Sequence, residues 1–295
     1  MRIELLDRRH ATALTGFLKN HLHSSLFICS NLQRKGVRYD GAAFSGEYFG
    51  LVSDDETTVY GVLVHYWNGK LLMQCPDTEH LSWLCDFFVS YCERAVDGLI
   101  GPTEQAELCI EALGLGSRDF SVRRAETLMS MAMTDLAPAY STLCDGFELA
   151  LPSIERVNVL TQWLLDYEIE AFGAAMNKRL QASVDERVQK YLNGREGWFL
   201  LKEQNPVAFS GFNASASGMV QVGPVWTPRE YRNCGYARRV VSGTLKIMHG
   251  QGYSDAVLFT DSAAARQAYS AVGFNKIGDY TLAFLAQATR LPVAH

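Results

Sequence analysis

The sequence predicts a mixed α/β fold that is built twice along the chain. Strand-like runs of β-branched and aromatic residues alternate with helical patterns of apolar residues, and the order of these patterns in the first half returns in the second. The composition, 48% hydrophobic and 20% charged, is typical of a globular protein with a substantial core. At 295 residues, the chain has room for two domains of ordinary size.

In the first half, apolar runs predict strands, and apolar spacings of three and four predict helices. The predicted strands cover residues 3–5, 48–52, 59–67, 71–75, 99–100 and 128–133. The predicted helices cover residues 11–18, 26–32, 80–94 and 104–113. Asn68-Gly69 is a strong hairpin signal and predicts the turn before the fourth strand.

The second half has the same kinds of element in the same order. The predicted strands cover residues 147–151, 198–201, 207–212, 219–226 and 256–260. Ser153 is the expected N-cap of a helix that continues to about residue 172, and a second helix is expected over 185–192. A third helix is expected from about Ala237, with Gly250 as its C-terminal cap.

Local echoes indicate that the two halves are copies of one fold. Gly69 precedes a strand as Gly218 does, and the segment 111–115 resembles the segment 270–274. We therefore expect two tandem domains, residues 1–140 and residues 141–295, joined by a linker around 137–146.

The segment 219–239, MVQVGPVWTPREYRNCGYARR, leads from a predicted strand to a predicted helix through a short loop. Pro228 has no N–H for a sheet, so the strand is expected to end there. The first turn of a helix has unpaired N–H groups and attracts anions, and Gly235 and Ala237 let an anion approach the backbone. Positive charge comes from Arg232, Arg238 and Arg239. This pattern alone is also compatible with an ordinary start of a helix.

A second motif makes the first one specific. The loop has the form R-x-x-G-x-A, from Arg232 to Ala237, and it follows a strand that contains V-x-P. After the next predicted strand come Ser262, Ala265, Tyr269, Gly273 and Phe274. In this order, the two motifs resemble the pyrophosphate loop and the N-x-x-A-x-x-x-Y-x-x-x-G-F ending of the GNAT acyl-CoA-dependent N-acyltransferases. The resemblance covers roughly residues 147–285.

The resemblance implies an N-acetyltransferase with acetyl-CoA as co-substrate. It implies that the pantetheine arm pairs with the backbone of Val225, Trp226 and Thr227, and that a backbone N–H there polarises the acyl carbonyl. The implied pyrophosphate site consists of Arg232, Asn233, Cys234, Gly235, Tyr236, Ala237 and Arg238. Tyr269 has the position of the acid that protonates the departing thiolate. Ser262 replaces the family's asparagine, which weakens the expected cofactor contact there.

Other residues leave the chemistry open. By spacing alone, Tyr269 is more typical of a packing aromatic on an amphipathic helix. No general base is identifiable: Glu168 and Glu170 fit a solvated helix face, and Gln221 lies on the strand where some relatives carry a carboxylate. A water relay or an already deprotonated substrate is then expected. Cys234 has no histidine nearby in sequence, and it receives no catalytic role.

The first copy lacks the loop. Gly69 and Gly114 are 45 residues apart, whereas Gly218 and Gly273 are 55 apart. The first copy has the acidic segment 76–79 at the position of the loop, and carboxylates repel an anion. We therefore expect the first domain to be a degenerate copy that serves as a scaffold or as a wall of the substrate site.

The composition argues against two classes of partner, nucleic acids and membranes. A net charge of −5 and a pI of about 5.8 argue against a nucleic-acid surface, and no apolar run is long enough to predict a membrane span. The seven cysteines form no C-x-x-C pair, which favours reduced thiols in the cytoplasm and predicts no metal site. We expect a small-molecule amine as acceptor and leave a homodimer open. The alternative is a non-catalytic acyl-CoA-binding regulatory or interaction protein.

Overall fold

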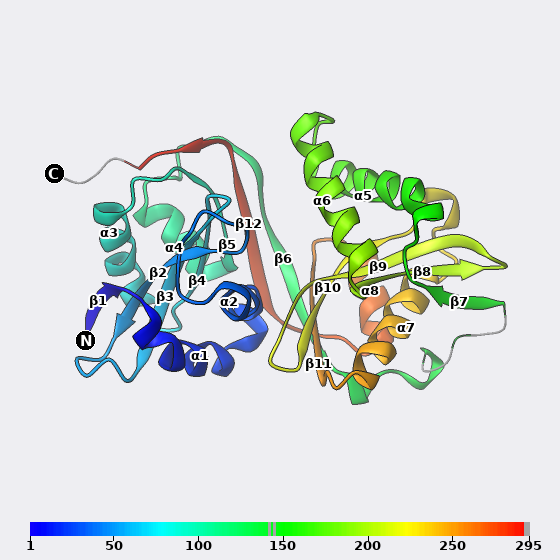
Figure 1. Ribbon diagram of the computed structural model, residues 1–295, viewed down its shortest axis with the longest axis horizontal. Helices are drawn as coiled ribbons and strands as arrows, with labels where there is room; N and C mark the ends of the chain where they lie inside the picture. Colours follow the sequence, from blue (N-terminus) through cyan, green and yellow to red (C-terminus); the bar gives the residue numbers. More distant parts are fainter. Residues whose placement is uncertain (141–142, 144–145, 292–295) are drawn as a thin grey trace. The chain divides into compact units, whose positions relative to one another are not determined.

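The computed structural model describes residues 1–140, 143 and 146–291 (Figure 1). They form two compact units, Met1–Leu128 with Ile277–His295, and Met129–Lys276. Each unit has a sheet flanked by helices, so the predicted α/β class is confirmed. The sequence divided the chain once, at residue 140, whereas the first unit also includes the C-terminal segment. Part of the predicted linker, residues 141–142 and 144–145, lies outside the described residues.

The first unit has a mixed sheet with the strand order β1-β2-β3-β4-β5-β12, and the start of β6 follows β12. The pairing is parallel between β4 and β5 and antiparallel in the other pairs from β1 to β12. Its strands are β1 (Arg2–Leu5), β2 (Gly46–Val52), β3 (Val59–Tyr66), β4 (Lys70–Gln74), β5 (Val96–Pro102), β6 (Phe120–Ala132) and β12 (Asn275–Thr289). Its helices are α1 (Ala11–Asn20), α2 (Leu22–Lys35), α3 (Leu81–Tyr91) and α4 (Thr103–Ala112).

The second unit has the strand order β6-β11-β10-β9-β8-β7, and the end of β6 belongs to it. The pairing of β10 with β11 is parallel, and the pairs from β10 to β7 are antiparallel. Its other strands are β7 (Phe147–Ala150), β8 (Gly197–Lys202), β9 (Asn205–Ala216), β10 (Met219–Trp226) and β11 (Asp255–Thr260). Its helices are α5 (Val157–Phe172), α6 (Lys178–Asn193), α7 (Tyr236–Gly250) and α8 (Ala263–Val272).

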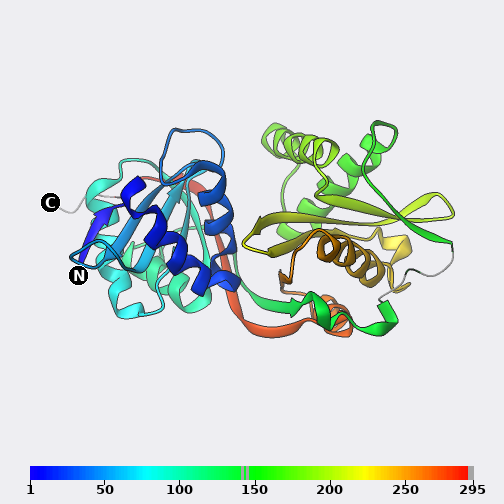
Figure 2. The same cartoon turned by 60° about the horizontal axis from the view of Figure 1, so that its bottom comes forward.

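The two faces of the second sheet bury different helices. Side chains of α5 and α6 pack with Phe199 and Phe209 on one face. Side chains of α7 pack with Val220 and Val222 on the other. Figure 2 shows the green helices α5 and α6 and the orange helix α7 on opposite sides of the strands. Because successive side chains of a strand alternate between faces, Gln221 points to the α5/α6 face.

Several predicted boundaries are wrong. The strand β6 begins at Phe120 rather than at 128, and β12 was not predicted. The early residues of β12 include Lys276, Gly278 and Asp279, which have low β propensity, so tertiary pairing determines this strand. The helix α6 begins at Lys178 rather than at 185, because Asn177 caps it by accepting a hydrogen bond from the N–H of Leu180 at 2.9 Å.

Two predicted caps also differ in detail. Gly250 is the last residue of α7, and Gln251 is the C-cap. Ser153 does stand at an N-cap position, but it precedes a short 3₁₀ turn, residues 154–156, and its hydroxyl makes no cap hydrogen bond. The Asn68-Gly69 turn is as predicted, with Gly69 at a φ of +76° and its N–H bonded to the carbonyl of Tyr66.

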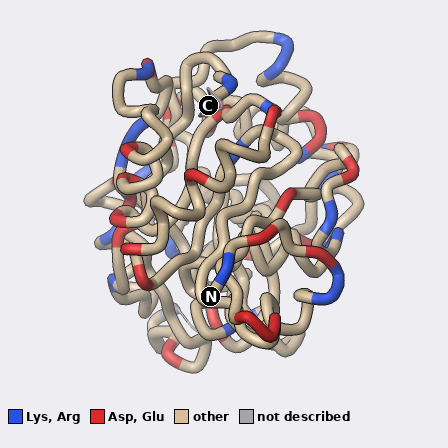
Figure 3. Tube along the Cα trace, turned by 90° about the vertical axis from the view of Figure 1, so that its left-hand side faces the viewer, with Lys and Arg blue, Asp and Glu red and all other residues tan. Residues whose placement is uncertain are grey.

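Among the described residues, no helix is long and apolar enough to cross a membrane. Basic and acidic residues are interspersed along the trace seen in Figure 3. This arrangement agrees with the small net charge of −5.

Candidate functional site

The strand β10 separates from its parallel neighbour halfway along its length. Its paired positions with β11 are Met219–Gln221 opposite Asp255–Val257, although β10 continues to Trp226 and β11 to Thr260. The pairing of β10 with β9 also shifts register at Gln221 and Val222, as at a β-bulge. Among the described residues, the backbone of β10 beyond Gln221 is not paired with β11, so it has an edge where an extended ligand can add hydrogen bonds.

Gly223 lies in this bulge and is required there. Its φ is +152°, and a Cβ would lie 2.9 Å from Nδ2 of Asn213. A larger residue would therefore meet backbone strain and would also displace the side-chain amide of Asn213. Val225 and Trp226, which follow, lie on opposite faces: Val225 packs with the α7 cluster, and the ring of Trp226 lies 6.5 Å from the ring of Tyr167 on α5.

The loop after β10 leads directly into α7. A short 3₁₀ turn, Arg229–Tyr231, follows Pro228, and Asn233 and Gly235 adopt left-handed conformations with φ of +63° and +77°. Gly235 is the N-cap of α7, where no side chain makes a cap hydrogen bond and no acidic residue lies in the first turn. Since the first N–H groups of a helix have no partner within it, this turn is suited to an anion.

Arg232 is directed back toward the end of β10. Its Nε donates to the carbonyl of Thr227 at 3.0 Å, its Nη1 lies 2.8 Å from Oε1 of Glu170, and its guanidinium lies 5.1 Å from the ring centre of Trp226. Glu170 also binds Arg229, at 3.1 Å. The hydrogen bond from Arg232 lowers the pKa of Glu170. These contacts connect the end of α5 to the loop.

The remaining loop residues have varied contacts. Cys234 is exposed, and its Sγ approaches the carbonyl of Arg232 at 3.5 Å. The guanidinium of Arg239 lies 5.0 Å from the ring centre of Phe147, so this arginine faces the start of the unit's first strand. Arg238 lies close to Gly235, where a Cβ would be 3.5 Å from its Nη2. The structure therefore brings the predicted loop residues together around the start of α7.

The second motif builds α8. Ser262 is the N-cap of this helix, and its hydroxyl accepts a hydrogen bond from the N–H of Ala265 at 3.2 Å. Serine and asparagine both cap helices well, so the replacement of asparagine preserves the helix start. Tyr269, two turns further along α8, is half-buried with its ring edge-on to Phe274 at 6.1 Å. Burial raises its pKa to about 12, so its hydroxyl stays protonated near neutral pH.

Buried polar atoms without hydrogen-bond partners gather in the second unit. Among the described residues, these atoms belong to Ser153, Arg187, Ser210, Gln221, Trp226 and Thr227 there, and to Glu4 and His10 in the first unit. Unpaired buried polar groups cost free energy, so their concentration is typical of a binding site. Sequence reasoning missed Arg187, because no local pattern distinguishes it from other arginines on an amphipathic helix.

Two carboxylates considered as general bases are in ion pairs. Oε1 of Glu168 lies 2.9 Å from Nη1 of Arg187, and Glu170 binds Arg229 and Arg232. The ion pairs of Glu170 lower its pKa, so this carboxylate is a weaker proton acceptor than a free one. Glu170 nevertheless lies near the end of β10, because its partner Arg232 also lies against the ring of Trp226.

The corresponding segment of the first unit is occupied by its own side chains. Asp77 accepts a hydrogen bond from the N–H of Glu79 at 3.4 Å and lies 3.1 Å from Nδ1 of His80. The helix α3 then begins at Leu81. The carboxylate of Asp77 thus caps the short 3₁₀ turn, residues 78–80, that leads into α3.

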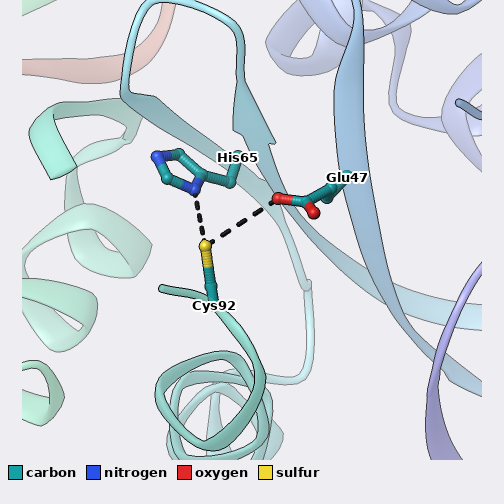
Figure 4. A group of neighbouring side chains, drawn as sticks. All are labelled: Glu47, His65 and Cys92. Carbon is teal, nitrogen blue, oxygen red and sulfur yellow. Dashed lines mark hydrogen bonds between the residues drawn. The ribbon is translucent and has the colours of Figure 1, made fainter. Parts of the chain in front are cut away.

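The first unit also contains a polar cluster of Glu47, His65 and Cys92 (Figure 4). Nδ1 of His65 lies 3.0 Å from Sγ of Cys92, and Nε2 lies 3.2 Å from the carbonyl of Ala95. Cys92 approaches Oε2 of Glu47 at 3.8 Å, and Arg94 donates to the same oxygen at 2.9 Å. Burial lowers the pKa of His65 to about 3 and raises the pKa of Cys92. A neutral histidine and a neutral thiol with these partners are typical of a hydrogen-bond network that supports the fold.

Comparison with known proteins identifies the family of the second unit. The family model described as "Acetyltransferase (GNAT) family" matches residues 157–274. No curated protein matches the chain.

Solved structures match over nearly the whole length. A GCN5-related N-acetyltransferase from Sphaerobacter thermophilus is 13% identical with a TM-score of 0.57, covering 98% of this chain and 96% of its own. An acetyltransferase of the GNAT family from Colwellia psychrerythraea is 15% identical with a TM-score of 0.52, covering 96% and 100%. A tandem GNAT protein from the clavulanic acid biosynthesis pathway is 10% identical with a TM-score of 0.52, covering 97% and 98%. Residues 157–274 therefore belong to the acetyltransferase (GNAT) family, and the chain as a whole has the fold of tandem GNAT proteins.

Proposed function

We propose that the second unit transfers an acetyl group from acetyl-CoA directly to the amine of a small molecule. The observation that supports this most is the separation of β10 from β11 beside the uncapped start of α7. One feature provides a backbone edge for an extended arm, and the other provides N–H groups for phosphates. Both lie within the segment that matches the acetyltransferase family.

The start of α7 suits the anionic pyrophosphate of acetyl-CoA, because it has no side-chain cap and no acidic residue in its first turn. The backbone of Val225, Trp226 and Thr227 would pair with the pantetheine arm, and an N–H there would polarise the acyl carbonyl. The pyrophosphate would lie at the start of α7, against the loop residues Arg232, Asn233, Cys234, Gly235, Tyr236, Ala237 and Arg238. When bound, acetyl-CoA supplies the acetyl group as an activated thioester.

In this proposal, few side chains can donate or accept a proton during the reaction. The hydroxyl of Tyr269 is protonated at neutral pH and would donate to the departing thiolate. Glu168 and Glu170 are in ion pairs, and the amide of Gln221 cannot accept a proton at neutral pH. We therefore assign the removal of the amine proton to water or to an acceptor that binds as the free amine. Ser262 would contact the cofactor while its hydroxyl also caps α8.

The first unit is proposed to be a degenerate copy without a cofactor site. The hydrogen bond between Asp77 and Glu79 occupies the segment before α3 with a carboxylate, which would repel phosphates. Acetyl-CoA is therefore expected to bind with a stoichiometry of one per chain, which isothermal titration calorimetry measures.

Thermal unfolding with acetyl-CoA tests the cofactor site. A ligand at 100 times its dissociation constant adds about 2.7 kcal/mol to the free energy of unfolding. We expect this stabilisation in the wild type and its loss in Gly235→Glu, which places a side chain and a negative charge at the anion site. Gly116→Glu is the control, because Gly116 has open space around it in the first unit. Absence of stabilisation in the wild type would contradict the proposal.

A second function is a non-catalytic acyl-CoA-binding protein. This function is favoured because Gln221, rather than a carboxylate, stands on β10, and because Glu168 and Glu170, the two candidate bases on α5, are both in ion pairs. Release of free thiol from acetyl-CoA with a panel of amines discriminates between the two. Binding without thiol release on every amine would support the binding protein.

A further inference from the structure

Arg187 on α6 has two buried donors without a partner. Its Nη1 lies 2.9 Å from Oε1 of Glu168, which fixes the guanidinium in place. In the part of the chain that the structure describes, its Nε and Nη2 have no hydrogen-bond partner, although both are buried. These two atoms form one edge of the guanidinium, and that edge matches the two oxygens of a carboxylate. The unpaired edge therefore calls for an anion with planar, bidentate geometry.

Gln221 has a buried hydrogen-bond acceptor without a described partner, whereas Arg187 has two such donors. Its Nε2 donates to the carbonyl of Val222 at 2.9 Å, while its Oε1 is buried with no described partner. The opposite amide orientation would place two oxygens together, so the hydrogen bond determines which atom is unpaired. The side chain of Gln221 is 4% exposed. A buried carbonyl oxygen of this kind calls for an N–H donor.

Both side chains belong to the α5/α6 face of the second unit. Tyr191 lies one helical turn after Arg187, and a Cβ on Gly211 would lie 2.6 Å from its hydroxyl. Further along β9 comes Asn213, which together with Gln221 borders the space beside Gly223. Tyr191, Gly211 and Asn213 thus connect Arg187 to the bulge of β10.

The same face reaches the end of β10 through α5. Glu168, the partner of Arg187, follows Tyr167 in sequence, and the ring of Tyr167 contacts the ring of Trp226. Nε1 of Trp226 is itself buried with no described partner. Arg187 and Gln221 therefore belong to one face of the second unit, and Trp226, at the end of β10 where it has left β11, contacts α5 on this face.

We propose that this face binds the acceptor, and that the acceptor is an amine that also carries a carboxylate, as an amino acid does. Nε and Nη2 of Arg187 bind the carboxylate, and Oε1 of Gln221 accepts a hydrogen bond from the amine. One small molecule then satisfies both the unpaired donors and the unpaired acceptor. This inference rests on the proposed acetyl transfer for the fate of the amine, but the binding site itself does not.

The test compares amino acids with their decarboxylated amines as acceptors. Thiol release from acetyl-CoA is measured on matched pairs, such as alanine with ethylamine and phenylalanine with phenethylamine. For the most reactive pair, we expect kcat/KM to be about 10- to 100-fold higher for the amino acid, as for the loss of a charge-assisted bidentate contact. Equal values within every pair, or reaction of the amines alone, would overturn the inference.

Variants of Arg187 assign the effect to one side chain. Arg187→Gln is expected to lower kcat/KM for the amino acid much more than for the amine, so that the ratio of the two values falls toward one. Arg187→Lys keeps the charge but not the bidentate edge, so a partial loss is expected. Arg195→Gln is the matched control, because Arg195 is an exposed arginine of the same unit. An equal loss for both members of a pair in Arg187→Gln would count against a carboxylate contact.

A binding measurement separates this inference from the proposed function. Saturation-transfer NMR with the amino-acid panel is recorded on the full chain without acetyl-CoA, for the wild type and Arg187→Gln. Amino-acid binding that depends on Arg187 supports the subsite even if acetyl-CoA fails to stabilise the protein. Absence of amino-acid binding together with absence of their acetylation would overturn the subsite, even if acetyl-CoA binds.

Discussion

At the scale of single residues, one side chain often serves both the fold and the proposed chemistry. Ser262 caps α8 and also has the position of a cofactor-binding residue in the family that the sequence resembles. Tyr269 packs against Phe274 and also has the position of the acid. The sequence pattern alone cannot separate these roles, because packing and chemistry use the same spacing on a helix.

Tyr269→Phe separates packing from acid catalysis. Phenylalanine keeps the ring and its contact with Phe274, so the free energy of unfolding is expected to change little. If the hydroxyl protonates the thiolate, kcat should fall about 100-fold while the KM for acetyl-CoA is retained. Steady-state thiol release from pH 6 to pH 9 measures this. Full activity across this range would show that Tyr269 is only a packing residue.

His65 predicts a pH dependence of stability. Burial, reinforced by the charge of Arg94, lowers the pKa of His65 to about 3 in the folded protein, whereas an unfolded histidine titrates near 6.5. Between these values, the unfolded chain binds a proton that the folded chain does not. The stabilisation from neutral His65 is therefore complete above pH 6.5 and is lost as the pH falls toward 3, by up to about 1.4 kcal/mol per pH unit.

The measurement is urea unfolding of wild type and His65→Gln between pH 5 and pH 7. Below pH 6.5, the free energy of unfolding should fall less steeply in His65→Gln, by the contribution of one proton. His249→Gln is the control, because His249 is exposed on α7. A slope that is identical in wild type and His65→Gln would mean that His65 does not titrate as described.

At the scale of elements, the geometry of the candidate site depends on which strands pair and where the pairing ends. The sequence predicted β10 and β11 as strands, but not that they pair over Met219–Gln221 alone. Local propensity determines which segments are extended, whereas pairing depends on neighbours far away in the sequence. The same applies to Glu170, whose ion pairs connect α5 to the loop before α7.

Gly98→Ala tests the pairing of β5 with β12. Gly98 has a φ of +148°, and a Cβ there would lie 2.9 Å from Cα of Phe284 and even closer to the carbonyl oxygen of Ala283. Backbone atoms cannot move aside cheaply, so we expect the free energy of unfolding to fall by about 2 kcal/mol or more. Gly116→Ala, at a site with open space, should change it by less than about 1 kcal/mol. Equal stability of the two variants in urea unfolding would contradict this pairing.

At the scale of the whole molecule, the two units are not two consecutive halves of the sequence. The first unit takes its strand β12 from the C-terminal end of the chain. Ala283 and Leu285 of this strand lie in the same core cluster as Phe49 and Leu99. A single cut near residue 140 would therefore leave the first unit without part of its core.

Removal of residues 277–295 tests this composition. We expect the shortened chain to lose hydrogen-exchange protection in β2 to β5 and in α3 and α4, because β5 loses its neighbour and the core of the first unit loses β12. Protection in β8, β9 and α7 of the second unit should remain. Hydrogen exchange with mass spectrometry measures both. Loss confined to the second unit would contradict the assignment of β12.

By itself, the sequence determined the α/β class, the tandem arrangement and the two motifs around Gly235 and Tyr269, because these depend on local spacing. Tertiary structure alone decided that β12 joins the first unit, that β10 leaves β11 after Gln221, and that Arg187 has an unpaired buried edge. The physical reason is that pairing and burial depend on contacts between distant segments. The residue type and its spacing determine which bonds a side chain can form, and the fold determines which of these bonds are formed within the protein.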